Sequence, residues 1–382
     1  MSMSGDPALL PVYAQMPVHV VSGRGCRLVD VDGNEWLDAY GGHAVASSGH
    51  SHPRVVRAIA DQAEQLLFYS AAIPLPIREE LATALTERCP GALDRVFFCN
   101  SGAEANENAF ALARKRTGRQ HLVSVEGGWH GRTPGALSVT TGRRYEEAAK
   151  RSGVPLSTRV PFNDVDAMRA AVDNTVAAVI VEPVQGIQGA RDCSPEFLSA
   201  AREACTAHGA ALIFDEIQCG VGRTGHFTAA ESFGVTPDAI TMAKGLAAGL
   251  PIGAVVVTPW LAEGLRIGDL GSTFGGGPVV CAAALANLDV IDEEGLMQNV
   301  LMVGTRIRAG AAALGIPEVQ GKGLLLGLRL HGPAAPTQRA LFEHRIITGT
   351  SADPDVLRLM PPLSFSPADA DELLGALAKV LS

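Results

Sequence analysis

Between residues 95 and 258 the chain alternates short apolar, β-branched runs with longer segments of helical character. The short runs are RVFFCN, HLVSVE, VAAVIVEP, ALIFDEI, AITMAK and IGAVVVT, and the first two are separated by the helical segment AEANENAFALARKR. Strands that alternate with helices form a mostly parallel sheet with helices on both faces. The sequence therefore predicts an α/β fold in which ligands bind at the carboxyl ends of the strands.

The two ends of the chain have a different pattern. Antiparallel hairpins are predicted in CRLVDVDGNEWLDAY near the start and in GKGLLLGLRLHG near the end. Asp32-Gly33 in the first of these is typical of a two-residue turn. We expect both ends to form one smaller α+β domain from residues 1–45 and 276–382, beside a large domain formed by residues 46–275.

Charge and composition exclude several kinds of partner. With 31 Lys and Arg against 40 Asp and Glu, the formal net charge is −9, and no basic run offsets it. Nucleic acid is therefore not an expected partner. The N-terminus lacks the pattern of a signal peptide, and no apolar run approaches the ~20 residues of a membrane span. We expect a cytoplasmic protein that does not contact membranes.

The cysteines indicate neither disulfides nor a metal site. There are seven, an odd number, widely scattered and without a Cys-x-x-Cys pair. Buried thiols are the simpler interpretation.

One strand leads directly into a helix at a turn suited to a phosphate. The segment FFCNSGAEANENAFALAR places Ser101, Gly102 and Ala103 at the predicted start of a helix. Free N–H groups and the helix dipole favour an anion there. An ordinary strand-to-helix turn capped by Ser101 is the equally good alternative.

Two charged residues follow later strands of the predicted sheet. Asp215 ends the apolar run ALIFD, and a buried carboxylate needs a cationic partner such as a pyridinium nitrogen. Lys244 ends the run AITMAK before a glycine-rich turn, where an amine could form an imine with an aldehyde cofactor. Taken singly, Asp215 could be an ordinary capping residue and Lys244 a surface lysine.

A set of motifs in fixed order connects these residues. They are NSGAEANE, WHGRT, VEPVQG, IFDEIQCGVGRTG, MAKGL, GSTFGG, GKGLLLGLRL and LRLMPPL. Together they resemble the class III aminotransferases, in particular the acetylornithine aminotransferase branch, from about Tyr13 to Leu363. The resemblance implies the fold type I of pyridoxal-5′-phosphate-dependent transferases.

The resemblance also implies how the cofactor is held. Lys244 would form the Schiff base and move the proton between Cα and C4′, and Asp215 would pair with the pyridine nitrogen. The remaining implied contacts are Gln218 to the phenolic oxygen, Trp129 on the ring face, and Ser101, Gly102, Ala103 and Thr273 at the phosphate. Because Thr273 comes from the neighbouring subunit in similar enzymes, a homodimer with shared active sites is implied.

For the substrate, the resemblance assigns two arginines. Arg132 in HGRT and Arg358 in VLRLMPP match carboxylate binders, for which a guanidinium fork is suited. Tyr13 matches a position that helps to hold the substrate carboxylate. Glu182 in VEP matches an active-site support residue, and a structural ion pair is its alternative.

Four positions depart from the family pattern, and one of them is Trp129, which stands where the family usually has Phe. Ile187 stands where most relatives have a Glu that can mask the second arginine, so Arg358 should always be available to a carboxylate. His43 replaces Ile or Tyr, and Gly277 replaces a common Asn. These departures leave open whether the acyl group of the substrate is acetyl or succinyl. His50 and His52 in GHSHP match a structural turn of the family, and no metal site is predicted.

The expected reaction moves the δ-amino group of an N-acylated ornithine, N-acetylornithine or N-succinylornithine, to 2-oxoglutarate, in arginine biosynthesis. Alternatives on the same fold are an ω-aminotransferase for ornithine, 4-aminobutyrate or a lysine-pathway amine, an aminomutase, and a non-catalytic regulator. Retention of Lys244, Asp215 and Gln218 argues against the regulator.

Overall fold

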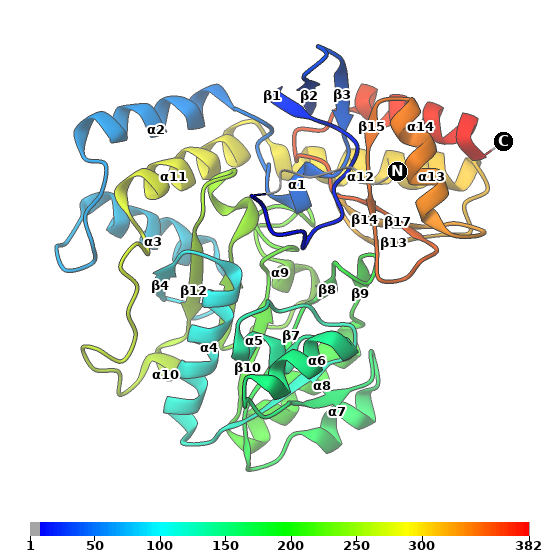
Figure 1. Ribbon diagram of the computed structural model, residues 1–382. Coiled ribbons are helices and arrows are strands. Elements are labelled where there is room, and N and C mark those ends of the chain that lie inside the picture. The colour runs from blue at the N-terminus through cyan, green and yellow to red at the C-terminus, as the bar shows by residue number, and fades with distance from the viewer. Residues whose placement is uncertain (1–7, 382) are drawn as a thin grey trace.

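The predicted alternation of strands and helices builds one seven-stranded sheet (Figure 1). The computed structural model describes residues 8–381. In spatial order the strands are β4 (Arg95–Cys99), β12 (Gly253–Val257), β11 (Ala239–Met242), β10 (Ala211–Asp215), β7 (Val176–Val181), β5 (His121–Val125) and β6 (Thr158–Val160). Only β12 is antiparallel to its neighbours, so the prediction of a mostly parallel sheet is confirmed.

Helices cover both faces of this sheet. They are α3 (Pro76–Arg88), α4 (Gly102–Thr117), α5 (Pro134–Val139), α6 (Arg143–Arg151), α7 (Val165–Ala171), α8 (Pro195–His208), α9 (Ala229–Phe233), the 3-10 helix η1 (Lys244–Ala247) and α10 (Pro259–Ala262). Ile213 of β10 packs in one core with Phe110 of α4, whereas the next residue, Phe214, packs in another with Phe197 of α8. Since successive strand residues point to opposite faces, α4 and α8 lie on opposite sides of the sheet.

Both ends of the chain contribute to a smaller α+β part, as the fold class requires. One sheet has the order β1 (Val20–Arg24), β2 (Arg27–Asp30), β3 (Glu35–Asp38), β15 (Ile346–Ile347), and another the order β13 (Glu318–Lys322), β14 (Leu325–Arg329), β17 (Val356–Leu359), β16 (Gly349–Thr350). The parallel pairing of β3 with β15 joins the first residues to the last hundred. The helices here are α12 (Leu296–Ala313), α13 (Ala334–Glu343) and α14 (Pro367–Leu381).

A long helix connects the two parts. In Figure 1, α11 (Pro278–Glu293) runs beside α2 (Pro53–Gln65), and it also contacts α3. The remaining short elements are α1 (Gly41–Ala44) and the two-stranded sheet of β8 (Val184–Gln185) and β9 (Arg191–Asp192). Because α11 packs on elements of the expected large domain, the exact boundaries at residues 45 and 275 stay a prediction.

The first hairpin differs from the expected two-residue turn. Asp30 pairs with Asn34 through the backbone, so three residues, 31–33, form the loop. The Asp30 carboxylate accepts hydrogen bonds from the N–H groups of Asp32 and Asn34 at 3.0 and 2.8 Å, and this local side-chain contact closes the wider loop. The second hairpin, β13–β14, does have a two-residue turn, at Gly323-Leu324.

The seven cysteines all lie within residues 8–381 and form no disulfides. All seven thiols are free, and all are buried except Cys89, which is half-buried. Within residues 8–381 no three His, Cys, Asp or Glu side chains cluster in a way that could hold a metal, and no helix there is long and apolar enough to span a membrane. His50 instead pairs with Asp38 at 2.7 Å, and His52 with Glu294 at 3.0 Å.

Candidate active site

Two adjoining cavities lie between the large sheet and the small part. The inner cavity, of about 350 Å³, is lined by Ser101, Gly102, Ala103, Trp129, His130 and Lys244, among others. The outer cavity, of about 1050 Å³, is lined by Tyr13, His43, Glu182, Ile187, Gln218 and Arg358, among others, and by Arg132. Lys244 and Trp129 line both cavities. The fold thus brings together residues from five separate motifs around one lysine.

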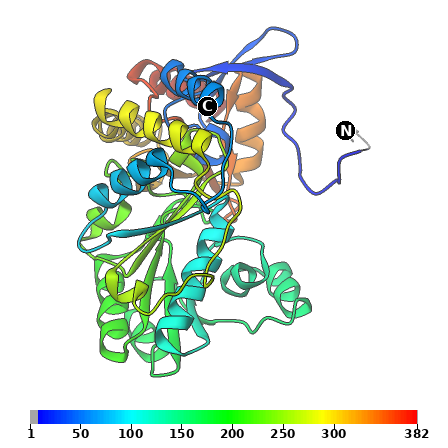
Figure 2. The ribbon, with the colours of Figure 1, turned by 90° about the vertical axis from the view of Figure 1, so that its left-hand side faces the viewer.

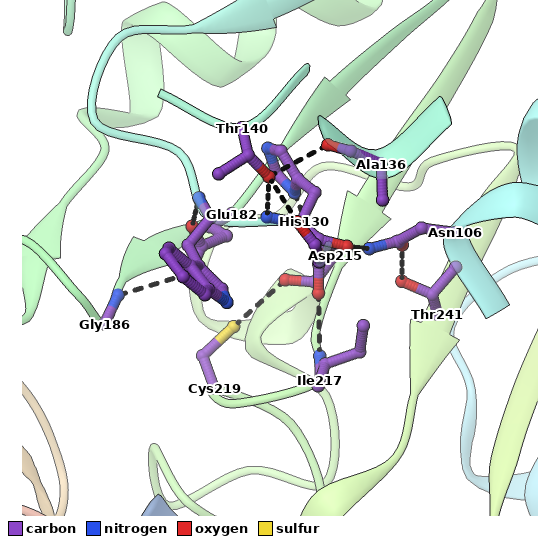
Figure 3. A network of polar contacts seen from close by, with 12 residues as sticks. Asn106, His130, Ala136, Thr140, Glu182, Gly186, Asp215, Ile217, Cys219 and Thr241 are labelled. Carbon is purple, nitrogen blue, oxygen red and sulfur yellow. Dashed lines mark hydrogen bonds and ion pairs between the residues drawn. The ribbon is translucent and has the colours of Figure 1, made fainter. Parts of the chain in front are cut away.

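Asp215 is held in a buried hydrogen-bond network behind the inner cavity (Figure 3). Its Oδ2 atom lies 2.8 Å from Nδ1 of His130 and accepts a hydrogen bond of 2.8 Å from Nδ2 of Asn106. Its Oδ1 atom accepts from the N–H group of Ile217 at 3.1 Å. These contacts fix the carboxylate in one orientation, as a buried charge requires.

Sequence reasoning missed two members of this network. Asn106 donates to both Asp215 and the His130 carbonyl, and its own carbonyl oxygen accepts from Thr241 at 2.8 Å. His130 is fixed at its backbone N–H by Thr140 at 3.0 Å. Both residues lie inside motifs already singled out, NSGAEANE and WHGRT. Asn106 has polar neighbours on both sides in this helix, Glu104, Glu107 and Asn108, so no sequence signal distinguishes it from them.

Lys244 occupies a strained backbone position at the end of β11. Its φ is 43°, in the left-handed region that is uncommon for residues other than glycine. Burial lowers the pKa of its ammonium group below the ordinary value, and the negative charges of Asp215 and Glu182 only partly oppose this. A lysine with a depressed pKa is the form suited to nucleophilic attack on a carbonyl.

The start of α4 opens onto the inner cavity. Ser101 caps the helix, and its Oγ accepts from the N–H group of Glu104 at 3.2 Å. The first N–H groups of a helix have no partner within it, so those of Gly102 and Ala103 are free to bind a ligand. A side chain at Gly102 would collide with Ile217, and the glycine therefore keeps this corner open.

Glu182 is a buried carboxylate at the end of β7. Its pKa is raised to about 7, mainly by burial; Asp215 also raises the pKa, whereas His130 and a hydrogen bond from the backbone of Trp129 lower it. Its Oε1 atom accepts from the Trp129 N–H at 2.7 Å and its Oε2 atom from the Gly186 N–H at 3.3 Å. The carboxylate of Glu182 therefore connects the loop that contains Trp129 with the loop that contains Gly186.

Trp129 and Gln218 are positioned by their neighbours. The Trp129 ring meets Tyr145 edge-on, with centroids 4.8 Å apart. Gln218 donates from Nε2 to the His43 carbonyl at 3.3 Å, and its Oε1 atom lies against the α-carbon of Gly186. Any side chain at Gly186 would displace this amide.

Arg358 is 4% exposed and has no carboxylate partner among residues 8–381. Its Nε atom donates to the Thr350 carbonyl at 2.6 Å, Nη1 to the Gly186 carbonyl at 3.1 Å, and Nη2 to the hydroxyl of Tyr40 at 3.4 Å. Since a guanidinium has five N–H donors, two are left for a ligand. A buried cation of this kind is suited to receive an anion from the cavity.

The other substrate candidates lie at the mouth of the outer cavity. Arg132 donates from Nη2 to the Tyr13 hydroxyl at 2.9 Å, and its guanidinium lies 5.6 Å from the Tyr13 ring. Residues 12–17 belong to the segment before β1, which extends from the body of the molecule in Figure 2. Ile187 lines the same cavity and presents no charge to Arg358.

The predicted site residue Thr273 lies elsewhere, and so does Gly277, one of the departures from the family pattern. Thr273 is exposed and lines neither cavity, although its neighbour Ser272 accepts a hydrogen bond of 3.1 Å from Asn100 at the inner cavity. Gly277 is the N-cap of α11 and offers that helix no side-chain cap. Compared with Asn, a glycine N-cap costs only a few tenths of a kcal/mol.

Comparisons with known proteins agree with this geometry. The sequence matches the family "Aminotransferase class-III" over residues 10–381. It is 44% identical to the acetylornithine aminotransferase of Streptomyces coelicolor, covering 98% of this chain and 93% of that protein, and 41% identical to that of Methanopyrus kandleri, covering 98% and 97%.

Solved structures lead to the same family. An ornithine aminotransferase from Toxoplasma gondii superimposes with a TM-score of 0.91 at 31% identity, covering 98% of this chain and 92% of that one. A transaminase from the marine bacterium Virgibacillus gives a TM-score of 0.89 at 26% identity, covering 96% and 93%. The chain therefore belongs to the class-III aminotransferases, which depend on pyridoxal phosphate.

Proposed function

We propose that this aminotransferase moves the δ-amino group of an N-acylated ornithine, with N-acetylornithine as the first choice and N-succinylornithine as the second, to 2-oxoglutarate. The relatives named acetylornithine aminotransferase support this choice. The observation that carries it is Arg358, a buried guanidinium without a carboxylate partner, beside Lys244 in the outer cavity. The reaction would belong to arginine biosynthesis, and we expect the protein in the cytoplasm.

The residues in and behind the two cavities around Lys244 fit pyridoxal phosphate. The free N–H groups of Gly102 and Ala103, with Ser101, suit its phosphate, and the Asp215 carboxylate suits its pyridinium nitrogen. Trp129 would cover one ring face, and Gln218 would contact the phenolic oxygen. When bound, the cofactor supplies an aldehyde for the amine and a ring that accepts electrons.

The protein's own groups then bind substrate and move protons. Lys244, with its depressed pKa, takes the proton from the carbon that bears the reacting amine. Asn106, His130 and the Ile217 N–H hold the Asp215 carboxylate in one orientation, in which it would pair with the ring nitrogen. Glu182 holds Trp129 and Gly186 in place through their N–H groups.

Two arginines would hold the carboxylates of the substrates. Arg358 offers a two-pronged donor from a buried position, so it suits the carboxylate of 2-oxoglutarate. Arg132, fixed by Tyr13, would hold the carboxylate of the amino donor at the cavity mouth. Because Ile187 cannot mask Arg358, the same arginine is available in both half-reactions.

We also propose a homodimer in which Thr273 completes the phosphate site of the partner subunit. An apolar patch next to Thr273 supports this. It consists of Leu67, Phe68, Tyr69, Ile73 and Phe274, all exposed. Arg78 ties the patch together by donating to the carbonyls of Tyr69, Ile73 and Gly276. Such contiguous exposed apolar groups mark an interface.

A single-turnover titration of the purified holoenzyme tests the substrate. N-acetylornithine, N-succinylornithine and ornithine are added separately without 2-oxoacid, and the visible absorbance of the lysine-bound cofactor is followed. We expect the acylated donors to discharge this absorbance, and 2-oxoglutarate to restore it with release of glutamate. Ornithine as the fastest donor would replace the proposal with an ornithine aminotransferase, and turnover that needs no 2-oxoacid would indicate an aminomutase.

A further inference from the structure

His43 is one of the departures from the family pattern, and it lies in the cavity that would hold the amino donor. Its side chain lines the outer cavity together with Lys244 and Arg358. Its backbone is left-handed, with φ 67° and ψ 39°. In this conformation the His43 carbonyl accepts a hydrogen bond from the side-chain amide of Gln218, which fixes His43 in the wall of the outer cavity.

A chain of hydrogen bonds points to one tautomer of His43. Nδ1 of His43 lies 2.7 Å from the hydroxyl oxygen of Tyr40, and that oxygen lies 3.4 Å from Nη2 of Arg358. A guanidinium can only donate, so the Tyr40 oxygen accepts from Arg358. If the Tyr40 oxygen also accepted from His43, the phenolic proton would have no acceptor among residues 8–381, so we assign that proton to the bond with Nδ1 of His43.

Both groups are in the neutral state that this chain requires. Burial raises the pKa of the Tyr40 phenol, which therefore keeps its proton. Desolvation lowers the pKa of the His43 imidazole, and the positive charges of Arg358, Lys244 and Arg132 lower it further. A neutral imidazole that accepts at Nδ1 carries its proton at Nε2. No residue among those described accepts that proton.

The outer cavity has no place for a second ammonium group. Four arginines line it, Arg132, Arg144, Arg339 and Arg358, and none of them pairs with a carboxylate within residues 8–381. Glu182 is the one acidic residue of the described lining, and both its oxygens already accept backbone N–H groups. A free α-ammonium would therefore meet positive charge and find no unpaired carboxylate in the described lining.

We infer that His43 recognises the acyl group of the donor, with its Nε2–H donating to the carbonyl oxygen of the amide. Acylation removes the charge that the cavity repels and adds the acceptor that this N–H needs. The inference rests on the proposed function and adds the residue that selects an acylated over a free α-amine. Tyr40 acts through His43 as a positioning residue.

Donor selectivity of the holoenzyme tests this role. Single-turnover kcat/KM is measured for N-acetylornithine and for ornithine in wild type, His43→Leu and His43→Gln. We expect His43→Leu to lower the N-acetylornithine to ornithine ratio about tenfold, and His43→Gln, which keeps an N–H at a similar reach, to restore most of it. His226→Leu, the same change at a different cavity, should leave the ratio unchanged.

The outcomes separate this inference from the proposed function. Wild-type turnover of N-acetylornithine with an unchanged ratio in His43→Leu would overturn the inference alone, because a contact to the carboxylate common to both donors affects them equally. Failure of wild type to convert any acylated donor would overturn both.

The tautomer gives a second test that does not depend on turnover. In holoenzyme labelled with ¹⁵N-histidine, long-range ¹H–¹⁵N spectra distinguish a protonated from an unprotonated ring nitrogen, and the His43→Gln spectrum assigns the His43 signals. We expect Nδ1 without and Nε2 with a proton at neutral pH. Tyr40→Phe should convert this to a mixture of tautomers. A proton on Nδ1 in wild type would contradict the inference.

Discussion

The Nδ1 atom of His130 lies 2.8 Å from Oδ2 of Asp215, and both side chains are buried, with exposures of 0% and 3%. This contact and the one from Asn106 leave the carboxylate with no freedom to rotate. The Asp215 carboxylate is therefore already oriented before the cofactor binds, which lowers the cost of reorganisation during the reaction.

Replacing His130 tests whether its contact orients the Asp215 carboxylate. His130→Gln removes the imidazole contact, and loss of a hydrogen bond to a charged group costs roughly 1.5–3 kcal/mol. We expect the single-turnover rate with N-acetylornithine to fall about 10- to 100-fold. Asp215→Asn, which removes the charge itself, should cost more, about 10²- to 10⁴-fold, since a broken buried pair costs roughly 3–5 kcal/mol. Equal rates in His130→Gln and wild type would show that the contact with His130 is not needed to orient Asp215.

Lys244 is predicted to hold the cofactor covalently. Lys244→Ala should abolish the visible absorbance of the lysine-bound form and reduce turnover by at least about 10³-fold. Borohydride reduction followed by mass spectrometry gives a direct measurement, because wild type should gain the mass of the reduced cofactor and the variant should not. Lys244→Arg, which keeps the charge but cannot form an imine, is the matched control and should behave as the alanine variant does.

Glu182 should make the stability of the cofactor-free protein depend on pH. The pKa of its carboxyl is raised to about 7 from an ordinary value of 4.5, so between these values the unfolded chain releases a proton that the folded chain retains. Stability from this group is thus full below about pH 4.5 and is lost as the pH rises towards 7, by about 3 kcal/mol.

Urea unfolding across this pH range measures the effect. Glu182→Gln should lack this part of the slope, whatever its absolute stability, whereas the exposed Glu147→Gln should keep it. Parallel curves for Glu182→Gln and wild type would show that the carboxyl of Glu182 titrates normally.

A carboxylate at position 187 should mask Arg358. Ile187→Glu places an acidic side chain in the same cavity as the guanidinium, where it would compete with the carboxylate of 2-oxoglutarate. We expect KM for 2-oxoglutarate to rise about 10- to 100-fold, as for loss of a charge-assisted contact. Ile187→Gln has the same shape without the charge and should change KM much less. Matching effects of Glu and Gln would mean that shape, rather than charge, matters at position 187.

The apolar patch beside Thr273 should hold two subunits together. Phe274 is 63% exposed and its ring lies 4.9 Å from that of Phe68. Phe274→Asp should shift the sedimentation coefficient from dimer to monomer and weaken cofactor binding, because Thr273 would be withdrawn from the partner. Met302→Asp, a similar change at a 55% exposed residue of α12, should leave the dimer intact. If the wild-type protein sediments as a monomer, the proposal of an active site shared between two subunits is wrong.

Much of this protein was predictable from local pattern. Apolar strands that end at Asp215 and Lys244, and a helix that begins after Ser101, are set by the sequence within a few residues. Their convergence follows from the rule that parallel strands present their carboxyl ends at one edge. The first hairpin was wrong in detail, because the side chain of Asp30 competes with turn propensity and opens a three-residue loop.

Only the tertiary structure decided which polar groups meet. Asn106, His130 and Asp215 are separated by 24 to 109 residues along the chain, and no periodicity relates them. The path from Arg358 through Tyr40 to His43 spans 318 residues and depends on two hydrogen bonds of one hydroxyl group. Secondary structure is encoded by neighbours in sequence, whereas hydrogen-bond direction, burial and pKa depend on atoms that only folding brings together.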